Sequence, residues 1–278
     1  MPELPEVETV RRGLSQLVVG YRINAVQELH PRVRKSSSLS PISAIEGARI
    51  TGVNRRGKYL WFELDRPQVL AAHLGMSGQF LFQVKERPPA KHVRARFQIS
   101  KGRLKKELVF NDQRTFGWLS VEELDDGAPT SVAGIGLDPF DPLFDMDVTV
   151  KNYARRHLKI KTALLNQGIM SGVGNIYADE ALWRAKVHPE VLTSDLSMKK
   201  IEMVIDSAIA VMAEAILQGG TSFDDLYIDV NGESGFFEQS LSAYGQTDRP
   251  CPRCGSLIKR IVVGGRSSHY CPRCQRIR

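Results

Sequence analysis

The sequence predicts an α+β protein with an N-terminal β-sandwich and a flanking helix, followed by a helical domain that ends in a small hairpin. Short strand-like runs with frequent turn residues fill the first part of the chain. Runs with helical periodicity fill the second part, and two closely spaced cysteine pairs lie in the tail. The Pro-rich segment 138–144 separates the first two patterns, so we predict domains at residues 1–135, 145–240 and 245–278.

The composition is that of an ordinary globular protein. The chain has 278 residues, of which 42% are hydrophobic and 25% are charged, and this length is sufficient for two domains. It contains no run of 18 apolar residues, and no signal-peptide pattern opens it. We therefore expect a soluble intracellular protein that does not contact a membrane.

The basic charge is concentrated in the tail. The net charge is +7, yet residues 249–278 contain eight Lys or Arg and no Asp or Glu, which leaves 30 basic against 31 acidic residues elsewhere. A solvated charged surface usually carries both signs. A tail with a single sign indicates a polyanionic partner.

The first helix is predicted from Val7, Val10, Leu14 and Leu17, which recur at helical spacing, with Gly20 as its stop. Its apolar stripe should pack on a core and hold the N-terminus in place. The runs after it are typical, in number and turn punctuation, of a β-sandwich or barrel. These strand-like runs are Arg22–Val26, Ile50–Val53, Tyr59–Leu64, Val69–Leu74, Gln79–Val84, Ala95–Ile99, Glu107–Asn111 and Trp118–Val121.

Beyond the Pro-rich segment the apolar period becomes helical. We predict helices over Tyr153–Asn166, Asn175–Ala185 and Ser197–Leu217. The glycine-rich turn 168–174 is typical of a helix–turn–helix device, in which Asn175 would cap the second helix and its N-terminal amides would hold a phosphate. Plain packing of two helices is the alternative reading of the same pattern.

The tail carries a metal-site pattern. Cys251-x-x-Cys254 is followed after 16 residues by Cys271-x-x-Cys274. Two such pairs supply four thiolates for a tetrahedral zinc ion, and four protein ligands leave no open coordination position. We therefore predict one structural Zn²⁺, with free thiols or a redox pair as the alternatives.

A hairpin is predicted between the two cysteine pairs. Leu257–Val263 and Ser267–Tyr270 alternate as strands around Gly264-Gly265, with Arg266 just beyond the turn. His269 is an alternative zinc ligand, but four thiolates suffice. So small a hairpin has little core of its own, and it should need the metal to fold.

The first six residues, Met1-Pro-Glu-Leu-Pro-Glu6, have two readings. If Met1 is removed, Pro2 has a free secondary amine, of which about a tenth is unprotonated at pH 7, against well under about a thousandth for a lysine. Such an amine attacks an aldehydic carbon to give an iminium ion that is already cationic, with Glu3 beside it for proton transfer and Glu6 one helical turn further on. The alternative is that these residues only begin a helix, with Pro in the first turn and acids near the positive end of its dipole.

Further positions also have two readings. Lys58 follows a glycine and precedes an apolar strand, so it is either an ordinary strand-edge charge or a group that contacts phosphate or transfers protons. Met76 lies between two glycines, where a core methionine is not expected. The functional reading is that Met76 is an apolar wedge offered to a base stack. Arg114 and Phe116 follow the end of a predicted strand, and they too could be offered to a base stack.

Several segments of this chain match one protein family when they are taken together. They follow one another in the family's order along essentially the whole chain. They are Met1-Pro-Glu-Leu-Pro-Glu-Val-Glu-Thr-Val10, Arg56-Gly-Lys-Tyr-Leu60, His73-Leu-Gly-Met-Ser-Gly78, Gly172-Val-Gly-Asn-Ile-Tyr177 and the two Cys-x-x-Cys pairs. Together they resemble the formamidopyrimidine-DNA glycosylase family. The N-terminal hexapeptide and the cysteine pairs are each specific.

The resemblance implies a bifunctional base-excision repair enzyme with β- and δ-lyase activity. Its substrates would be oxidised purines, such as 8-oxoguanine and formamidopyrimidines, in duplex DNA, and its helical domain would have the helix-two-turn-helix form. Pro2 would be the nucleophile and Schiff-base residue, and Glu3 the proton donor. Lys58 would donate the proton in β-elimination and Arg266 the proton in δ-elimination. A monomer in the bacterial cytoplasm, associated with the nucleoid, is implied as well.

The resemblance also implies DNA contacts. Met76, Arg114 and Phe116 match the trio that fills the gap left by the extruded base and faces its orphaned partner. The phosphate-contacting positions of the family match His92, Lys161 and Asn175.

Two departures from the family pattern concern DNA contacts. Gln113 and Thr115 replace a proline and a second arginine that the family often has, and His157 stands where a lysine is often found. The sequence therefore does not decide whether Thr115 and His157 contact phosphate. The glycine-rich segment 230–237 falls where the family has its damaged-base loop; by its composition alone it is either a closing loop or a connection.

Two other functions are alternatives. An endonuclease VIII-type enzyme for oxidised pyrimidines typically opens with Met-Pro-Glu-Gly, whereas this chain has Leu4. A DNA-binding zinc-ribbon protein without catalysis would not need Pro2 and Glu3, which are both present.

Overall fold

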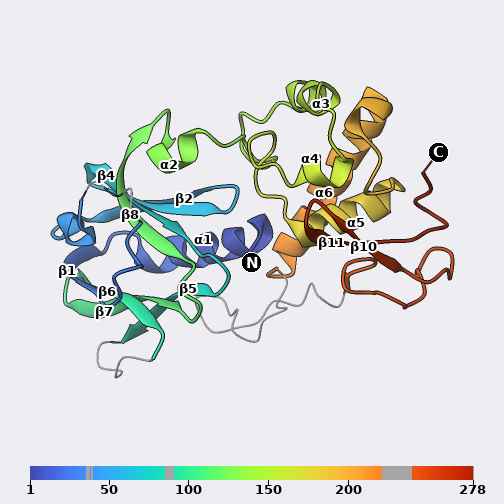
Figure 1. Ribbon diagram of the computed structural model, residues 1–278. Helices are drawn as coiled ribbons and strands as arrows, with labels where there is room; N and C mark the ends of the chain where they lie inside the picture. The colour runs from blue at the N-terminus through green and yellow to red at the C-terminus, as the bar shows by residue number, and fades with distance from the viewer. Residues whose placement is uncertain (36–37, 39, 85–90, 221–239, 278) are drawn as a thin grey trace. The chain divides into compact units, whose positions relative to one another are not determined.

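The computed structural model describes residues 1–35, 38, 40–84, 91–220 and 240–277 (Figure 1). The chain forms two compact units, of which the first contains Met1–Gly134 and the second contains Ile135–Gln218 and the described residues from Ser240 onward. In this part of the chain no helix is both long enough and apolar enough to cross a membrane. The segment 230–237, where the damaged-base loop is predicted, lies outside the described residues.

Two antiparallel sheets form the first unit, which confirms the predicted β-sandwich. Their strand orders are β1-β6-β7-β5 and β2-β3-β4-β8-β9, and each predicted strand-like run overlaps a strand. The strands are β1 (Arg22–Glu28), β2 (Ile50–Arg56), β3 (Tyr59–Leu64), β4 (Arg66–His73), β5 (Gly78–Val84), β6 (Val93–Lys101), β7 (Leu104–Asp112), β8 (Trp118–Asp125) and β9 (Ala128–Pro129). The short helices η1 (Ile42–Ile45) and α2 (Thr130–Ala133) complete the unit.

Strand β6 shows how the sequence builds the core. Val93, Ala95, Phe97 and Ile99 are buried, and the residues between them are half-buried. A strand turns successive side chains to opposite faces, so this alternation directs one side of the sheet into the core.

Helix α1 (Leu4–Val18) covers this core. Its buried residues Val7, Val10, Leu14 and Val18 belong to the same apolar cluster as the inner faces of both sheets. Each such side chain contributes about 2 kcal/mol when it leaves water, so the helix that carries the N-terminus is firmly anchored. Gly20, the predicted stop, lies just past the helix with φ +89°.

Helices make up most of the second unit. They are α3 (Met146–Ala154), α4 (Ile160–Leu164), α5 (Asn175–Ala185), η2 (Thr193–Asp195) and α6 (Met198–Leu217). The predictions over Asn175–Ala185 and Ser197–Leu217 are confirmed, and the Ser197 side chain caps α6 by accepting a hydrogen bond from the Lys200 N–H.

The predicted helix over Tyr153–Asn166 is wrong, because α3 ends at Ala154 and α4 begins at Ile160. Between them the chain leaves the helix, and residues 158–160 pair with residues 191–193. The Thr193 N–H donates to the Leu158 carbonyl (2.9 Å), and the Ile160 N–H donates to the Val191 carbonyl (2.8 Å). Tertiary pairing thus satisfies backbone groups that a continuous helix would have used.

The tail forms the predicted hairpin. Strands β10 (Lys259–Val263) and β11 (Arg266–Tyr270) pair antiparallel, and Val263 lies opposite Arg266. Gly264 and Gly265 form the connection with φ +57° and +75°, which is the backbone that a two-residue hairpin turn requires.

Candidate functional site

The start of the chain is held in a defined conformation. Glu3 is the N-cap of α1, and its backbone N–H donates to the Glu6 Oε2 atom at 2.8 Å. Pro2, Glu3 and Glu6 are buried, whereas Met1 is 49% exposed. The reading of these residues as a helix start is therefore correct. It leaves the nucleophile reading open, because a helix start also fixes the backbone of Glu3 beside Pro2.

An ion cluster on α1 fixes the helix against the sheet. The Glu8 carboxylate accepts from Arg11 and Arg12 at 2.8 Å and from Arg55 on β2 at 3.1 Å. Burial raises the pKa of Glu8, but the hydrogen bond from Arg11, the charge of Arg55 and the hydrogen bond from Arg12 outweigh it and lower this pKa to about 2. Arg11 also donates to the Val53 carbonyl at 3.3 Å. The carboxylate is therefore charged at neutral pH and ties α1 to β2.

Lys58 lies in the tight turn between β2 and β3, beside Gly57, whose φ is +56°. Only 5% of Lys58 is exposed, so it is not an ordinary solvated strand-edge charge. Its ammonium lies near enough to His73, at the end of β4, to lower the pKa of that imidazole.

His73 is a candidate that sequence reasoning missed, although it opens a segment that was singled out for Met76. Its ring stacks on Trp118 (centroids 6.0 Å apart, planes at 16°) and lies 4.8 Å from the ring of Tyr59. Its Nδ1 atom accepts from the Gly75 N–H at 3.1 Å. Burial, the charge of Lys58 and the charge of Lys35 lower its pKa to about 4. No sequence signal showed that two cross-strand neighbours, Tyr59 and Trp118, would pack against this ring.

We expect His73 to make stability depend on pH between 4 and 6.5. An unfolded histidine takes up its proton near pH 6.5 and the folded one near pH 4, so the stabilisation is fully present above 6.5 and is lost as the pH falls through this window. It amounts to about 3 kcal/mol at most. In urea unfolding followed at several pH values, His73→Asn, whose side-chain oxygen can replace the Nδ1 acceptor, should show a flatter profile. Equal slopes in variant and wild type would contradict this expectation.

Met76, Arg114 and Phe116, here called the wedge cluster, come together at the ends of β4 and β7. Met76 is 37% exposed and Phe116 is 61% exposed, although large apolar side chains are usually buried. The Arg114 Nη1 atom lies 3.7 Å from the Met76 Sδ atom. The cluster therefore offers two apolar groups and a guanidinium to a ligand.

The neighbouring predicted positions have different environments. His92 is half-buried just before β6, and its carbonyl accepts from the Asp112 N–H at 2.8 Å. Gln113 is exposed, and Thr115 is half-buried with φ +56°. In the second unit, His157 is exposed and its Nδ1 atom lies 3.0 Å from the Ser194 hydroxyl.

Lys161 departs from its prediction. Its side chain has no exposed surface and forms an ion pair with Asp179 on α5. The ammonium also donates to the carbonyls of Asn175 and Ser267, both at 3.4 Å. A fully buried, paired ammonium is not open to a phosphate. In this structure Lys161 instead joins the start of α5 to the hairpin strand β11, because Asp179 also accepts from the His269 N–H (2.9 Å).

Asn175 is the first residue of α5, and Gly174, not Asn175, is the N-cap. The predicted cap is therefore wrong, because the extended backbone at Gly174 makes Gly174 the cap and starts the helix at Asn175, one residue earlier than an Asn175 cap would. The half-buried Asn175 has a side-chain oxygen with no hydrogen-bond partner among the described residues. Its position at a helix N-terminus still suits an anion. Arg266 is exposed at the turn of the hairpin.

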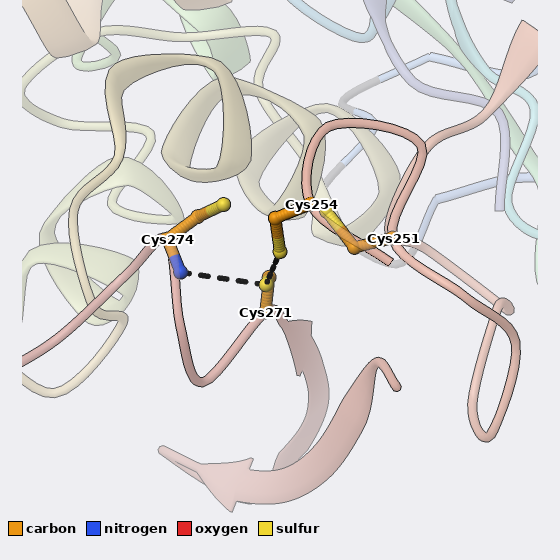
Figure 2. Close-up of side chains that lie close together, drawn as sticks. All are labelled: Cys251, Cys254, Cys271 and Cys274. Carbon is orange, nitrogen blue, oxygen red and sulfur yellow. Dashed lines mark hydrogen bonds between the residues drawn. The ribbon is translucent and has the colours of Figure 1, made fainter. Parts of the chain in front are cut away.

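The four cysteines form one site in the second unit (Figure 2). Their sulfur atoms all lie within 4.8 Å of one another, and the Sγ atoms of Cys254 and Cys271 are 3.4 Å apart. Four thiolates about 2.3 Å from a zinc ion would lie about 3.8 Å from each other, so the set fits a tetrahedral zinc. His269 does not belong to this set, because its Nδ1 atom faces Asp179 at 2.9 Å. The site can therefore hold one structural Zn²⁺ through four sulfurs.

Trp183 connects the cysteines to α5. Its indole Nε1–H lies 3.4 Å from the Cys251 sulfur, and the Arg253 guanidinium stacks on its ring at 4.0 Å. On the other side, Gln275 accepts from the Cys271 N–H (2.8 Å) and donates to the Val187 carbonyl (2.9 Å). A donor to a ligating sulfur stabilises the thiolate, so we expect Trp183 to retain the zinc.

Trp183→Phe tests this expectation, because phenylalanine keeps a ring beneath Arg253 and removes only the N–H donor. We expect the variant to release zinc to a colorimetric chelator about tenfold faster than wild type, the lower limit for losing such a contact to a metal ligand. Trp61→Phe, which changes a tryptophan buried in the first unit, is the matched control. Equal release rates in the three proteins would show that the indole does not act on the metal.

Comparison with known proteins accounts for all three parts of the chain. Residues 1–119 match the family model described as formamidopyrimidine-DNA glycosylase N-terminal domain. Residues 135–225 match the formamidopyrimidine-DNA glycosylase H2TH domain, and residues 249–277 match a zinc finger found in FPG and IleRS.

Curated relatives match over nearly their whole length. The protein named formamidopyrimidine-DNA glycosylase in Rhodococcus jostii (strain RHA1) is 53% identical over 283 residues, which covers 99% of this chain and 96% of the relative. The protein of the same name in Thermobifida fusca (strain YX) is 46% identical, with 99% and 97% covered.

Solved structures agree. The complex of a Lactococcus lactis FPG mutant with Fapy-dG-containing DNA gives a TM-score of 0.89 at 35% identity, covering 99% of this chain and 100% of that one. The MutM (FPG) protein of Thermus thermophilus gives 0.86 at 36% identity, with 99% and 98% covered. Both solved structures share the fold of this chain, and all three of its segments match models of one family. The chain therefore belongs to the formamidopyrimidine-DNA glycosylase family of DNA-repair enzymes.

Proposed function

We propose that this chain is a bifunctional DNA glycosylase and AP lyase that removes oxidised purines, such as 8-oxoguanine and formamidopyrimidines, from duplex DNA. The observation that carries the proposal is the capped start of α1, where the bond between Glu3 and Glu6 fixes the backbone next to Pro2. The solved complexes of the Lactococcus lactis protein with DNA containing an abasic site, and of a mutant of it with Fapy-dG-containing DNA, support it.

The nucleophile is the nitrogen of Pro2. In the full chain this nitrogen is acylated by Met1 and cannot react, so the first requirement is removal of Met1, which at 49% exposure is open to an aminopeptidase. The product is a secondary amine at the start of a helix whose entry is set by the Glu3–Glu6 bond. A fixed amine loses little freedom when it attacks, which favours the reaction.

Base excision follows from attack on C1′ of the damaged nucleotide. The Pro2 nitrogen bonds to C1′, and the base leaves with the electron pair of the glycosidic bond. The Pro2 nitrogen loses its proton, and the C1′–O4′ bond then breaks with its electron pair on O4′, which opens the sugar ring and leaves a cationic iminium ion. Glu3 donates the proton that O4′ takes up.

Strand cleavage follows from the acidity that the iminium ion creates. Loss of the C2′ proton expels the 3′ phosphate with the C3′–O electron pair (β-elimination), and loss of the C4′ proton then expels the 5′ phosphate (δ-elimination). By family resemblance, Lys58 is the proton donor of the first step and Arg266 that of the second. The burial of Lys58 keeps its ammonium in one place, as a proton donor requires.

DNA binding must also offset the free energy of turning a nucleotide out of the duplex, which is a few kcal/mol. The exposed Met76 and Phe116 can replace the lost stacking, and Arg114 can face the orphaned base. His92 and Asn175 are proposed phosphate contacts, and the basic tail 249–278 adds cations. The affinity should therefore fall as salt rises.

Borohydride trapping tests the proposal. The protein without Met1 is mixed with duplexes containing 8-oxoguanine, thymine glycol or no lesion, and sodium borohydride reduces any iminium ion to a stable covalent adduct. We expect an adduct with the 8-oxoguanine duplex only. Adducts confined to thymine glycol would favour a pyrimidine-specific enzyme, and binding without any adduct would favour a non-catalytic DNA-binding protein.

A further inference from the structure

Asp112 lies where the two loops of the wedge cluster meet. It is the last residue of β7 and pairs with Gly78, the first residue of β5. The loop before Gly78 carries Met76, and the loop after Asp112 carries Arg114 and Phe116. The Asp112 side chain has no exposed surface. A buried carboxylate needs several donors, so its partners show what it holds.

Those partners come from both loops. One carboxylate oxygen, Oδ1, accepts from the Ser77 hydroxyl at 2.6 Å and from the Arg114 N–H at 3.2 Å. The other oxygen, Oδ2, accepts from the Gly117 N–H at 2.7 Å. The Ser77 hydroxyl in turn accepts from the Arg114 N–H at 3.0 Å. One carboxylate and one hydroxyl thus connect the loop of Met76 to both ends of the segment 114–117.

The backbone of Asp112 holds further groups in the first unit. Its N–H donates to the carbonyl of His92, a proposed phosphate contact, at 2.8 Å. Its carbonyl accepts from the Arg94 Nε–H at 2.8 Å. The proposed DNA-contacting residues of the first unit thus lie on segments that this aspartate joins by hydrogen bonds.

The two loops are also packed backbone against backbone. A Cβ atom added to Gly75 would lie 2.4 Å from the Gly117 nitrogen, and one added to Gly117 would lie 2.9 Å from the His73 carbonyl oxygen. Between Arg114 and Phe116, Thr115 has φ +56°, a region that a β-branched residue avoids. A strained turn in close contact with a second loop persists only where its surroundings hold it, and here the holding groups are Asp112 and Ser77.

We propose that Asp112 is a positioning residue that holds Met76, Arg114 and Phe116 as one preassembled wedge before DNA binds. The inference rests on the proposed function, in which these three side chains replace the extruded base. A wedge on two loose loops would lose conformational entropy on insertion, and a rigid one would not. Asp112 touches neither substrate nor reacting atoms, so its effect should appear only where a base must be turned out.

Two substitutions break different parts of the connection. Asp112→Asn keeps an oxygen for Ser77 and Arg114 but places an NH₂ group against the Gly117 N–H, so it releases the Phe116 end. Ser77→Ala removes the bridge to the Met76 loop and leaves the Gly117 bond intact. Asp125→Asn, at the exposed end of β8, changes the charge equally and is the matched control. Thermal unfolding identifies any variant that fails to fold, and Ser77→Ala buries no new polar group.

Two substrates separate positioning from a general structural role. The first is a duplex with 8-oxoguanine opposite cytosine, from which the base must be turned out. The second is a duplex with a preformed abasic site opposite a one-nucleotide gap, where no base is extruded and none is orphaned. We expect both variants to lose about 10- to 100-fold in single-turnover rate on the first substrate, as for a small misplacement of a reacting group. On the second, borohydride trapping should change by less than about threefold.

Hydrogen exchange of the DNA-free protein tests, without reference to activity, whether Asp112 holds the wedge cluster in place. Exchange at Gly117 should accelerate in Asp112→Asn and stay unchanged in Ser77→Ala and Asp125→Asn. Equal rate losses of the two variants on both substrates would overturn the positioning role of Asp112. Wild-type rates of the variants on the first substrate, together with unchanged hydrogen exchange at Gly117, would overturn it as well. Absence of trapping in the wild type on either substrate would instead overturn the proposed function, and the exchange result would still stand.

Discussion

A Pro2→Gly variant from which Met1 has been removed is expected to form no borohydride-trapped adduct with an 8-oxoguanine duplex. Loss of a covalent nucleophile typically lowers the rate by many orders of magnitude, so we expect a decrease of at least about a thousandfold. Glycine retains a primary amine, but its imine must gain a proton before it becomes cationic. Glycine also lacks the ring that restricts the backbone beside the capped Glu3.

Duplex binding should survive the same substitution. The cations proposed to contact phosphate lie elsewhere in the chain, so the affinity measured by fluorescence anisotropy should stay within about twofold of wild type. Pro142→Gly, at an exposed proline of the second unit, is the matched control and should trap normally. Intact mass spectra must show that each protein lacks Met1. Undiminished trapping by Pro2→Gly would mean that a different amine forms the iminium ion.

Removal of zinc is expected to unfold the hairpin and abolish tight DNA binding. Among the described residues, Ile258 is the one buried side chain besides cysteines in the apolar cluster at the cysteine site, and Trp183 packs against it. Each hairpin strand has five residues. A two-stranded hairpin of this size is marginal in water, whereas zinc binding contributes on the order of 10 kcal/mol to folding in small zinc domains. Loss of the basic tail's structure should weaken duplex affinity by about 100-fold and flatten its salt dependence.

Hydrogen exchange locates the effect of zinc removal. After chelation, the amides of β10 and β11 should lose protection, whereas those of the first unit, which contains none of the cysteines, should keep it. Adding back zinc should restore both protection and binding, and magnesium should restore neither, because thiolates do not favour a hard cation. Protected β10 and β11 amides in the zinc-free protein would show that contacts such as His269 with Asp179 suffice to fold the hairpin.

Local patterns in the sequence were sufficient for much of the fold and for the zinc site. The alternation in β6, the helical spacing of Val7 to Leu14 and the glycine pair 264–265 each report an interaction between residues close in the chain. The cysteine spacing is equally local, because each Cys-x-x-Cys forms half of the site. Such signals require no knowledge of what packs against them.

Tertiary contacts decided the rest. The helix predicted over Tyr153–Asn166 is interrupted because residues 191–193 offer the backbone other partners. Lysine is usually exposed, so the sequence did not predict that Lys161 is buried. Its burial depends on the ion pair with Asp179, eighteen residues later in the chain. His73 and Asp112 stand in segments that the sequence singled out for other residues, and their environments come from strands up to 45 residues away.

Residue types and spacing were therefore enough to predict the zinc site and to propose the N-terminal Pro-Glu pair as the reacting group. The sequence did not predict the groups that position these residues, such as Ser77 and Asp112. A hydrogen bond from Ser77 to Asp112 spans 35 residues and leaves no periodic trace in the sequence, because either residue alone is common at a turn. Only the pairing of β5 with β7 brings them together and gives the carboxylate its role.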